Sequence, residues 1–281
     1  MTQTRSKHRH ISFTAHYTGY IWYSMGISHQ ALATKKGKTL AALVHPLESW
    51  AEKFVGGSMR STLKQRHSML DETLEKLVNL SPELQVLEIA CGLSPRGWWF
   101  RQHYPNIHYR ELDLPDMAAI KQTALQQFEQ NSPEVLSADL FTQEFESIFK
   151  LFDPQKPLVI ISEGLINYFS KPLLSELLLS IASYTQQFNQ LHYLTDLYPE
   201  PVHHKMATII WRSSKLLKWA SRSAFSFHFT TPKEVTTFFN ENEFSKVQVI
   251  QPTSYFNPPS TSTNDQKRHL GDLVWMIHAQ K

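Results

Sequence analysis

The stretch Val86-Leu-Glu-Ile-Ala-Cys-Gly-Leu-Ser-Pro-Arg-Gly97 decides the fold predicted for this chain. It begins as a short apolar run, typical of a buried strand, and continues through a glycine into a helix-like segment. In an open sheet of parallel strands, the turn between the first strand and its helix lies at the edge where ligands bind. Gly92 has no side chain, so the backbone of this turn can approach a ligand closely. We therefore expect a ligand-binding turn here.

Seven short apolar runs, this one included, predict strands at residues 85–90, 107–112, 134–138, 158–162, 191–194, 245–250 and 272–278. Helix-like segments separate the first five runs, which predicts parallel strands. The last two runs are separated only by a loop, predicted at 252–265, which favours an antiparallel pair. The predicted fold is therefore α/β, a doubly wound, mostly parallel seven-stranded sheet with an antiparallel C-terminal hairpin and a helical cap.

We expect one domain over residues 1–281, with a Rossmann-like core at 85–281. Residues 1–80 lack a strand pattern and carry leucines spaced for one helix face, so they predict an N-terminal helical cap region. A helical insertion with Trp211 and Trp219 is predicted at 201–226. Together these two segments are expected to roof the site.

Two later helices have clear start signals. Ser170 followed by Pro172 is typical of a helix N-terminus. Thr231-Pro-Lys-Glu234 is a capping box with proline at the first helical position. This second helix is expected to end near Phe244.

Composition narrows the function classes. With 28 Lys and Arg against 25 Asp and Glu, the net charge of +3 is too small to require a polyanionic partner such as nucleic acid. The single cysteine, Cys91, leaves no internal disulfide to form. No apolar stretch approaches the roughly 18 to 20 residues that cross a bilayer, and a signal peptide's apolar core is missing. We expect a cytoplasmic protein with no membrane partner.

A metal site is not expected. The sequence has 14 histidines, but His203 and His204 are adjacent. No helix-like segment carries two histidines four residues apart with an acid between them, as a zinc motif of that type requires.

Acidic residues lie at the ends of the predicted strands. Glu88, in the first strand, is placed to order the turn or to bind an amino group of a ligand. Glu111 and Asp113 end the second strand, and we expect only one of them to face the site. An acid about twenty residues beyond the glycine turn can accept hydrogen bonds from both ribose hydroxyls of an adenosine-containing cofactor.

The next two strand ends add further polar groups. Asp139 can accept from an adenine amino group while Leu140 covers the ring. Glu163 and Tyr168 follow the fourth strand and are expected at the mouth of the site. Carboxylates at three successive strand ends suit a cofactor with a cationic sulfonium and amine, and suit a diphosphate poorly.

This combination resembles the leucine carboxyl methyltransferase family, class I S-adenosylmethionine-dependent enzymes whose bacterial members include proteins resembling polyketide O-methyltransferases. In chain order, the similarity is carried by Ser12-Phe-Thr-Ala15, Arg66 with Asp71, Gly92-Leu-Ser-Pro-Arg96, Glu111-Leu-Asp-Leu-Pro115 with Lys121, Ser137-Ala-Asp-Leu140 and Glu163-Gly-Leu-Ile-Asn-Tyr168. Two departures stand out: Ala90 lies where members often have glycine, and Ser94-Pro95 replaces an acid and a small polar residue.

The resemblance implies S-adenosyl-L-methionine as cofactor and assigns roles to matching residues. Arg66 would bind the methionyl carboxylate, Asp113 the ribose, and Glu163 would face the methionyl end. From helix spacing alone, Arg66 is instead a surface residue paired with Asp71 or Glu72. The expected cofactor-binding residues are Arg66, Glu88, Ala90, Gly92, Asp113, Asp139, Leu140 and Glu163.

The implied reaction is attack by an acceptor oxygen on the sulfonium methyl. The acceptor is expected to be a small molecule or a peptide, with a carboxylate or a hydroxyl as the reacting group. A carboxylate needs no general base, and Arg96 or Arg212 would orient it. A hydroxyl benefits from a base, for which the candidates are Tyr168, Asp196, His203 and His204.

Two other functions fit parts of the pattern. A nicotinamide-dependent Rossmann oxidoreductase shares the glycine turn and the distant acid, although this sequence has no GxGxxG motif. A non-catalytic, cofactor-binding regulatory protein would keep the pocket and lose the acceptor site, as the altered Ser94-Pro95 turn permits.

Overall fold

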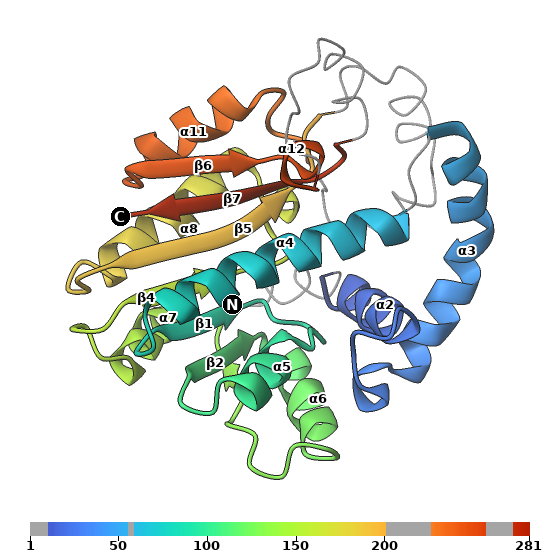
Figure 1. Cartoon of the computed structure of the whole chain (residues 1–281), viewed down its shortest axis with the longest axis horizontal. Coiled ribbons are helices and arrows are strands. Elements are labelled where there is room, and N and C mark those ends of the chain that lie inside the picture. Colours follow the sequence, from blue (N-terminus) through green and yellow to red (C-terminus); the bar gives the residue numbers. More distant parts are fainter. Residues whose placement is uncertain (1–10, 56–58, 201–225, 257–271) are drawn as a thin grey trace.

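The computed structural model describes residues 11–55, 59–200, 226–256 and 272–281. Seven strands form one sheet in the order β3-β2-β1-β4-β5-β7-β6 (Figure 1). Their bounds are β1 Gln85–Ile89, β2 His108–Asp113, β3 Leu136–Ser137, β4 Leu158–Ile161, β5 Leu191–Leu197, β6 Lys246–Ile250 and β7 Trp275–Gln280.

Strands β1 to β5 pair in parallel, and β7 pairs antiparallel with both β5 and β6. The predicted fold class, with its antiparallel C-terminal pair, is therefore confirmed. Strand β1 lies between β2 and β4, so the chain order reverses there. Such a reversal places the carboxyl ends of β1 and its neighbours around a crevice that can hold a ligand.

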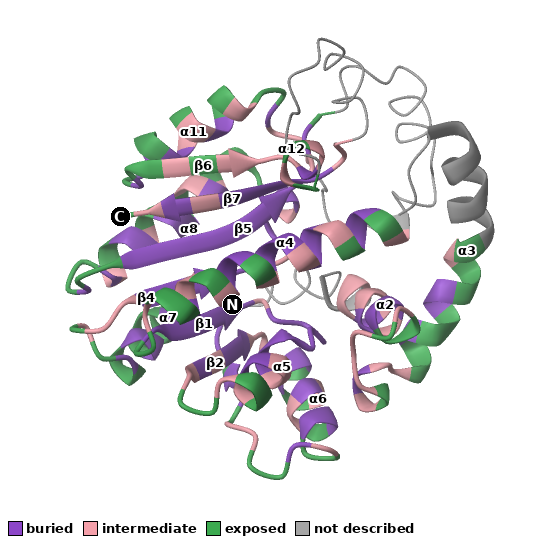
Figure 2. Ribbon diagram, viewed as in Figure 1, coloured by how far each residue is buried: buried purple, intermediate pink, exposed green. Residues whose placement is uncertain are grey.

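Helices cover both faces of the sheet (Figure 1). They are α2 Ile11–Ser24, α3 Lys35–Val55, α4 Met59–Leu80, α5 Arg96–His103, α6 Pro115–Leu125, α7 Gln143–Ile148, α8 Lys171–Tyr184, α11 Pro232–Glu241 and α12 Pro252–Phe256. Successive residues of β1 enter the cores on opposite faces of the sheet: Leu87 belongs to the core that includes residues of α7, α8 and α11, and Val86 belongs to the core that includes residues of α4 and α5. Because helices cover both faces, every residue of the central strands β1, β4 and β5 is buried (Figure 2).

The N-terminal helix α2 packs directly on the turn after β1. A Cβ atom added at Gly19 of α2 would lie 2.8 Å from Cβ of Leu93, and one at Gly92 would lie 3.1 Å from Cβ of Ala15. Small residues on both sides therefore allow this close approach. Most of the predicted insertion at 201–226 lies outside the described residues, and the proposed division into cap and core stays a prediction.

Both predicted helix starts are present, but the predicted end of the second helix and the predicted loop after it need correction. Ser170 and Thr231 each accept from a backbone N–H of their helix. Helix α11 ends at Glu241, before the predicted Phe244, because Glu243 takes a left-handed conformation with φ of 71°. The predicted loop at 252–265 begins instead as the short helix α12, whose Thr253 donates to the Asp272 carboxylate.

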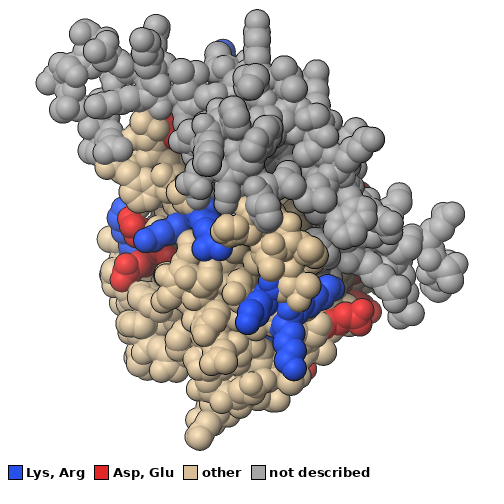
Figure 3. Space-filling model, turned by 90° about the vertical axis from the view of Figure 1, so that its right-hand side faces the viewer, with Lys and Arg blue, Asp and Glu red and all other residues tan. Residues whose placement is uncertain are grey.

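None of the described helices is both long and apolar enough to cross a bilayer. Within the described residues seen in Figure 3, basic and acidic side chains lie near one another on a mostly uncharged face. This mixture agrees with the small net charge of the chain.

Candidate functional site

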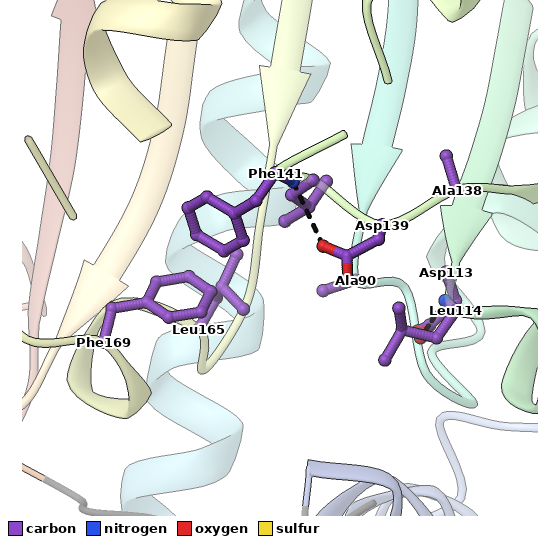
Figure 4. A pocket seen from close by; sticks show the side chains of 9 residues that line it. Ala90, Asp113, Leu114, Ala138, Asp139, Phe141, Leu165 and Phe169 are labelled. Atoms are coloured by element: carbon purple, nitrogen blue, oxygen red, sulfur yellow. Dashed lines mark hydrogen bonds between the residues drawn. The ribbon is translucent and has the colours of Figure 1, made fainter. Parts of the chain in front are cut away.

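A pocket opens at the carboxyl ends of the central strands (Figure 4). It holds about 400 Å³ of non-protein space, including its open mouth, and is lined by Ala90, Asp113, Leu114, Ala138, Asp139, Leu140, Phe141, Leu165 and Phe169. Figure 4 shows Phe141, Leu165 and Phe169 on one side of this space and Asp113 with Leu114 on the other. A mainly apolar lining with a few polar groups is typical of a small-molecule site.

Asp113 holds the glycine turn in place. Its carboxylate accepts hydrogen bonds from the backbone N–H of Gly92 and of Leu114, both at 2.7 Å. Burial raises the pKa of Asp113, although these two donors act in the opposite direction. The turn needs left-handed backbone at two residues, with φ of 50° at Ala90 and 49° at Gly92.

Asp139 and its neighbours Leu140 and Phe141 form another part of the pocket wall. One Asp139 carboxylate oxygen accepts from the backbone N–H of Phe141 at 3.1 Å, which fixes the bend after β3. The rings of Phe141 and Phe169 meet edge to face at 5.2 Å. Apolar walls with carboxylates at the rim fit a flat adenine ring and its ribose, whose amino and hydroxyl groups need acceptors.

A buried cluster of charges lies next to this pocket, centred on Arg66 of α4. Its Nε donates to Oε1 of Glu163 at 2.8 Å, and its Nη1 donates to the hydroxyl of Tyr198 at 3.2 Å. Asp196, at the end of β5, lies 3.5 Å from the same Nη1. Gly164 makes room for the guanidinium, because a Cβ there would lie 3.1 Å from Nη1. Arg66 is therefore no surface residue, and neither Asp71 nor Glu72 is its partner.

Arg96 forms the second half of the cluster and is fully buried. Its Nη1 donates to Oε1 of Glu88 at 2.8 Å, its Nη2 donates to Oε2 of Glu163 at 2.6 Å, and its Nε donates to Asp71. The expectation that Arg96 orients an acceptor is therefore wrong, since every donor group of its side chain has a carboxylate partner. Arginine suits such multiple pairing through its planar fork of donors.

Glu88 has both carboxylate oxygens engaged. Besides Arg96, it accepts from the hydroxyl of Tyr109 at 2.8 Å. This arrangement agrees with the first of its two predicted roles, ordering the turn. Contact between Glu88 and a cofactor stays a prediction.

The cluster shifts the pKa values of its two most central acids in opposite directions. Burial alone would raise the pKa of Glu163, but His67, Arg66 and Arg96 hold it well below its usual range. Burial raises the pKa of Asp196 to about 6; Arg66 opposes this shift and the nearby Glu163 adds to it. Asp196 therefore titrates close to neutral pH while Glu163 stays ionised.

Tyr168 borders the same cluster from the short helix η3 Ile166–Tyr168. Burial raises the pKa of its hydroxyl, and a hydrogen bond from Thr14 of α2, together with Arg66, acts against this shift. The structure thus brings Tyr168, Asp196 and Arg66 together. Three of the other acceptor-side candidates, His203, His204 and Arg212, lie outside the described residues, as do Trp211 and Trp219.

Glu111 belongs to a separate, structural cluster. Its carboxylate pairs with Lys121 at 2.6 Å and Arg101 at 2.9 Å, and Arg101 also pairs with Glu129 at 2.8 Å. Asp113 is therefore the one acid of the two that faces the pocket, as expected. Over the described ranges, no group of three or more His, Cys, Asp or Glu side chains is arranged to hold a metal ion.

Sequence reasoning missed His67, Gly164 and Tyr198. His67 contacts both Glu163 and Asp71. Its spacing of four residues from Asp71 was the one local signal available, because such pairs meet on a helix surface. Nothing in the sequence connects Tyr198 to Arg66.

Comparison with known proteins agrees with this geometry. A family model described as leucine carboxyl methyltransferase matches residues 28–182, more than half of the chain. Among curated proteins, no sequence matches significantly.

Two solved structures share the fold along nearly the whole chain. One is described as a "putative methyltransferase" from Thermobifida fusca YX, with 13% identity, a TM-score of 0.59 and 94% of each chain covered. The other is a DUF574 family protein from Streptomyces avermitilis MA-4680, with 15% identity, a TM-score of 0.60, and 95% of this chain and 97% of that chain covered.

Proposed function

Because the chain belongs to the leucine carboxyl methyltransferase family, we propose that it transfers the methyl group of S-adenosyl-L-methionine to an oxygen of a small-molecule or peptide acceptor. Methyl transfer and the cofactor follow from the family. The reacting oxygen, the acceptor and the residue roles below are the proposal.

The observation that carries the proposal is the pocket at the strand ends, with Asp113 and Asp139 on its rim. In this proposal Asp113 holds the ribose hydroxyls, and Asp139 and Leu140 meet the adenine. Gly92 and Ala90 let the backbone approach the cofactor. When bound, S-adenosylmethionine supplies an electrophilic methyl group on a sulfonium.

Arg66 and Glu163 would hold the methionyl end. A guanidinium can bind the cofactor's carboxylate, and a carboxylate can bind its ammonium group. The cluster contains four carboxylates, from Asp71, Glu88, Glu163 and Asp196, against the guanidinium groups of Arg66 and Arg96. This excess of negative charge in a buried site favours a ligand with cationic groups.

The acceptor would lie on the side of Tyr168 and Asp196. For a hydroxyl acceptor, Asp196 is the stronger candidate base, since its pKa of about 6 leaves it ionised and able to take a proton near neutral pH. For a carboxylate acceptor, Arg212 would provide the cation. Of the two guanidinium groups in the described cluster, Arg96 pairs with a carboxylate through each of its side-chain nitrogens, and Arg66 is assigned to the carboxylate of the cofactor.

Three variants separate the two kinds of acceptor: Tyr168→Phe, Asp196→Asn and Arg212→Ala. Transfer of labelled methyl from saturating S-adenosylmethionine is measured on matched pairs of small phenols and carboxylic acids, with the exposed Glu176→Gln as control. A hydroxyl acceptor predicts loss of turnover at Asp196 or Tyr168. Loss at Arg212 with no effect at the other two would eliminate the hydroxyl acceptor.

The same assay tests the non-catalytic alternative. A regulatory protein that keeps only the cofactor pocket would bind S-adenosylmethionine and transfer no methyl group. The family match gives no support to the nicotinamide-dependent alternative.

A further inference from the structure

His67 lies between two carboxylates at the centre of the charged cluster. Its Nδ1 is 2.9 Å from Oε2 of Glu163, and its Nε2 is 3.2 Å from Oδ2 of Asp71. His67 is 5% exposed, and its ring packs against the indole of Trp22 from α2, with ring centroids 5.2 Å apart. Such a buried imidazole needs a partner for each nitrogen.

The tautomer of His67 sets the direction of its hydrogen bonds. Oε2 of Glu163 only accepts, so in the tautomer that carries its proton on Nδ1 the 2.9 Å contact is a hydrogen bond from Nδ1–H to this carboxylate. Nη2 of Arg96 lies 3.0 Å from Nδ1 and donates to the same Oε2 of Glu163 at 2.6 Å. Two donors therefore converge on this oxygen, leaving Oε1 for Arg66.

We propose that His67 is a positioning residue of the cofactor site, whose Nδ1–H fixes the Glu163 carboxylate and through it the guanidinium of Arg66. This role rests on the proposed function, in which Arg66 and Glu163 hold the methionyl end. Arg96 alone cannot replace it, because its guanidinium is also shared with Asp71 and Glu88. A rotated Glu163 would release Nε of Arg66 from its 2.8 Å bond.

Two conservative variants separate the two ring nitrogens. The side-chain amide of asparagine places its NH2 near the position of Nδ1, and that of glutamine near Nε2. His67→Asn thus keeps a donor near Glu163, whereas His67→Gln places its donor near Asp71 instead. His67→Ala removes both.

Two probes separate positioning from general damage to the fold. S-Adenosylhomocysteine has the amino-acid end that Arg66 and Glu163 would bind, and 5′-methylthioadenosine lacks it. Binding of both is measured by calorimetry for the wild type and the three variants, and the urea midpoint of each protein is recorded.

We expect His67→Gln and His67→Ala to bind S-adenosylhomocysteine roughly 10- to 100-fold more weakly, the usual effect of losing a hydrogen bond to a charged group. His67→Asn should remain within about threefold of the wild type, and 5′-methylthioadenosine should bind all four proteins alike. Equal affinities of the Asn and Gln variants, or parallel losses for both probes, would overturn the positioning role. A wild type that binds 5′-methylthioadenosine but not S-adenosylhomocysteine also overturns it, whereas one that binds neither overturns the proposed function itself.

Discussion

Arg66 and Glu163 are joined by a 2.8 Å hydrogen bond although they lie 97 positions apart in the sequence. Arg66 comes from α4 and Glu163 from the segment after β4, so the bond ties the N-terminal helices to the carboxyl edge of the sheet. The side chains of both residues are nearly inaccessible to solvent. This pair connects the stability of the fold to the proposed cofactor site.

The first prediction concerns Glu163→Gln. Neutralising this carboxylate leaves Arg66 and Arg96 without one of their buried counter-charges, which costs about 3–5 kcal/mol in comparable pairs. We expect a lower free energy of unfolding in urea and binding of S-adenosylmethionine weakened at least roughly tenfold. The exposed Glu176→Gln should change neither quantity. An unchanged affinity in Glu163→Gln would remove Glu163 from the cofactor site.

A second prediction concerns Asp113→Asn. The amide keeps one acceptor for the N–H groups of Gly92 and Leu114 but loses the charge and the second acceptor. Affinity for S-adenosylmethionine should fall roughly 10- to 100-fold, measured by calorimetry. Asp116→Asn, exposed on α6, is the matched control. Equal affinities of these two variants would contradict a ribose-binding role for Asp113.

The raised pKa of Asp196 predicts a pH dependence of stability. Its value of about 6 in the folded protein exceeds the ordinary 3.8, so the native state binds a proton between about pH 4 and pH 6 that the unfolded state has released. Stability must therefore fall as the pH rises through this window. Between pH 4.5 and 7.5, we expect the wild type to lose about 2 kcal/mol relative to Asp196→Asn, measured by urea unfolding. A pH-independent difference between the two proteins would show that Asp196 has an ordinary pKa.

Gly97 provides a test of the structural cluster around Glu111. A Cβ at this position would lie 2.4 Å from the Glu111 carboxyl carbon, so Gly97→Ala must displace a carboxylate that is paired with Lys121 and Arg101. We expect a loss of about 2–3 kcal/mol in the free energy of unfolding. Gly26→Ala is the comparison, because its left-handed backbone is strained by a side chain but nothing lies within 4 Å of the new atom. Gly26→Ala should lower the free energy of unfolding by about 1–2 kcal/mol. A Gly97→Ala variant as stable as the wild type would mean that Glu111 is packed differently.

The central strands are predictable from the sequence because both faces of the sheet are buried. All four residues of β4, for example, are apolar and fully enclosed. The edge strand β3 is less well predicted: the apolar run covers 134–138, but only Leu136–Ser137 pair with a neighbour. An edge strand has one partner, so its length depends on that partner more than on its own residues.

The charged cluster is only partly predictable. Glu163 was recognisable from its place at a strand end, but its partners come from α4 and α5, and packing alone brings these together.

Glu111 and Asp113 show a related limit of prediction from the sequence. They are two residues apart and share one side of β2, so alternation does not distinguish them. The position of each residue along the strand distinguishes them, because Glu111 is covered by α5 and α6 whereas Asp113 lies in the pocket.

The most direct test of the account is a calorimetric titration of the full chain with S-adenosylmethionine, S-adenosylhomocysteine and NADH. The site described above predicts that the first two bind, each to one site per chain, and that NADH does not. Binding of NADH alone, or of none of the three, would contradict the assignment of this pocket to an adenosyl sulfonium cofactor.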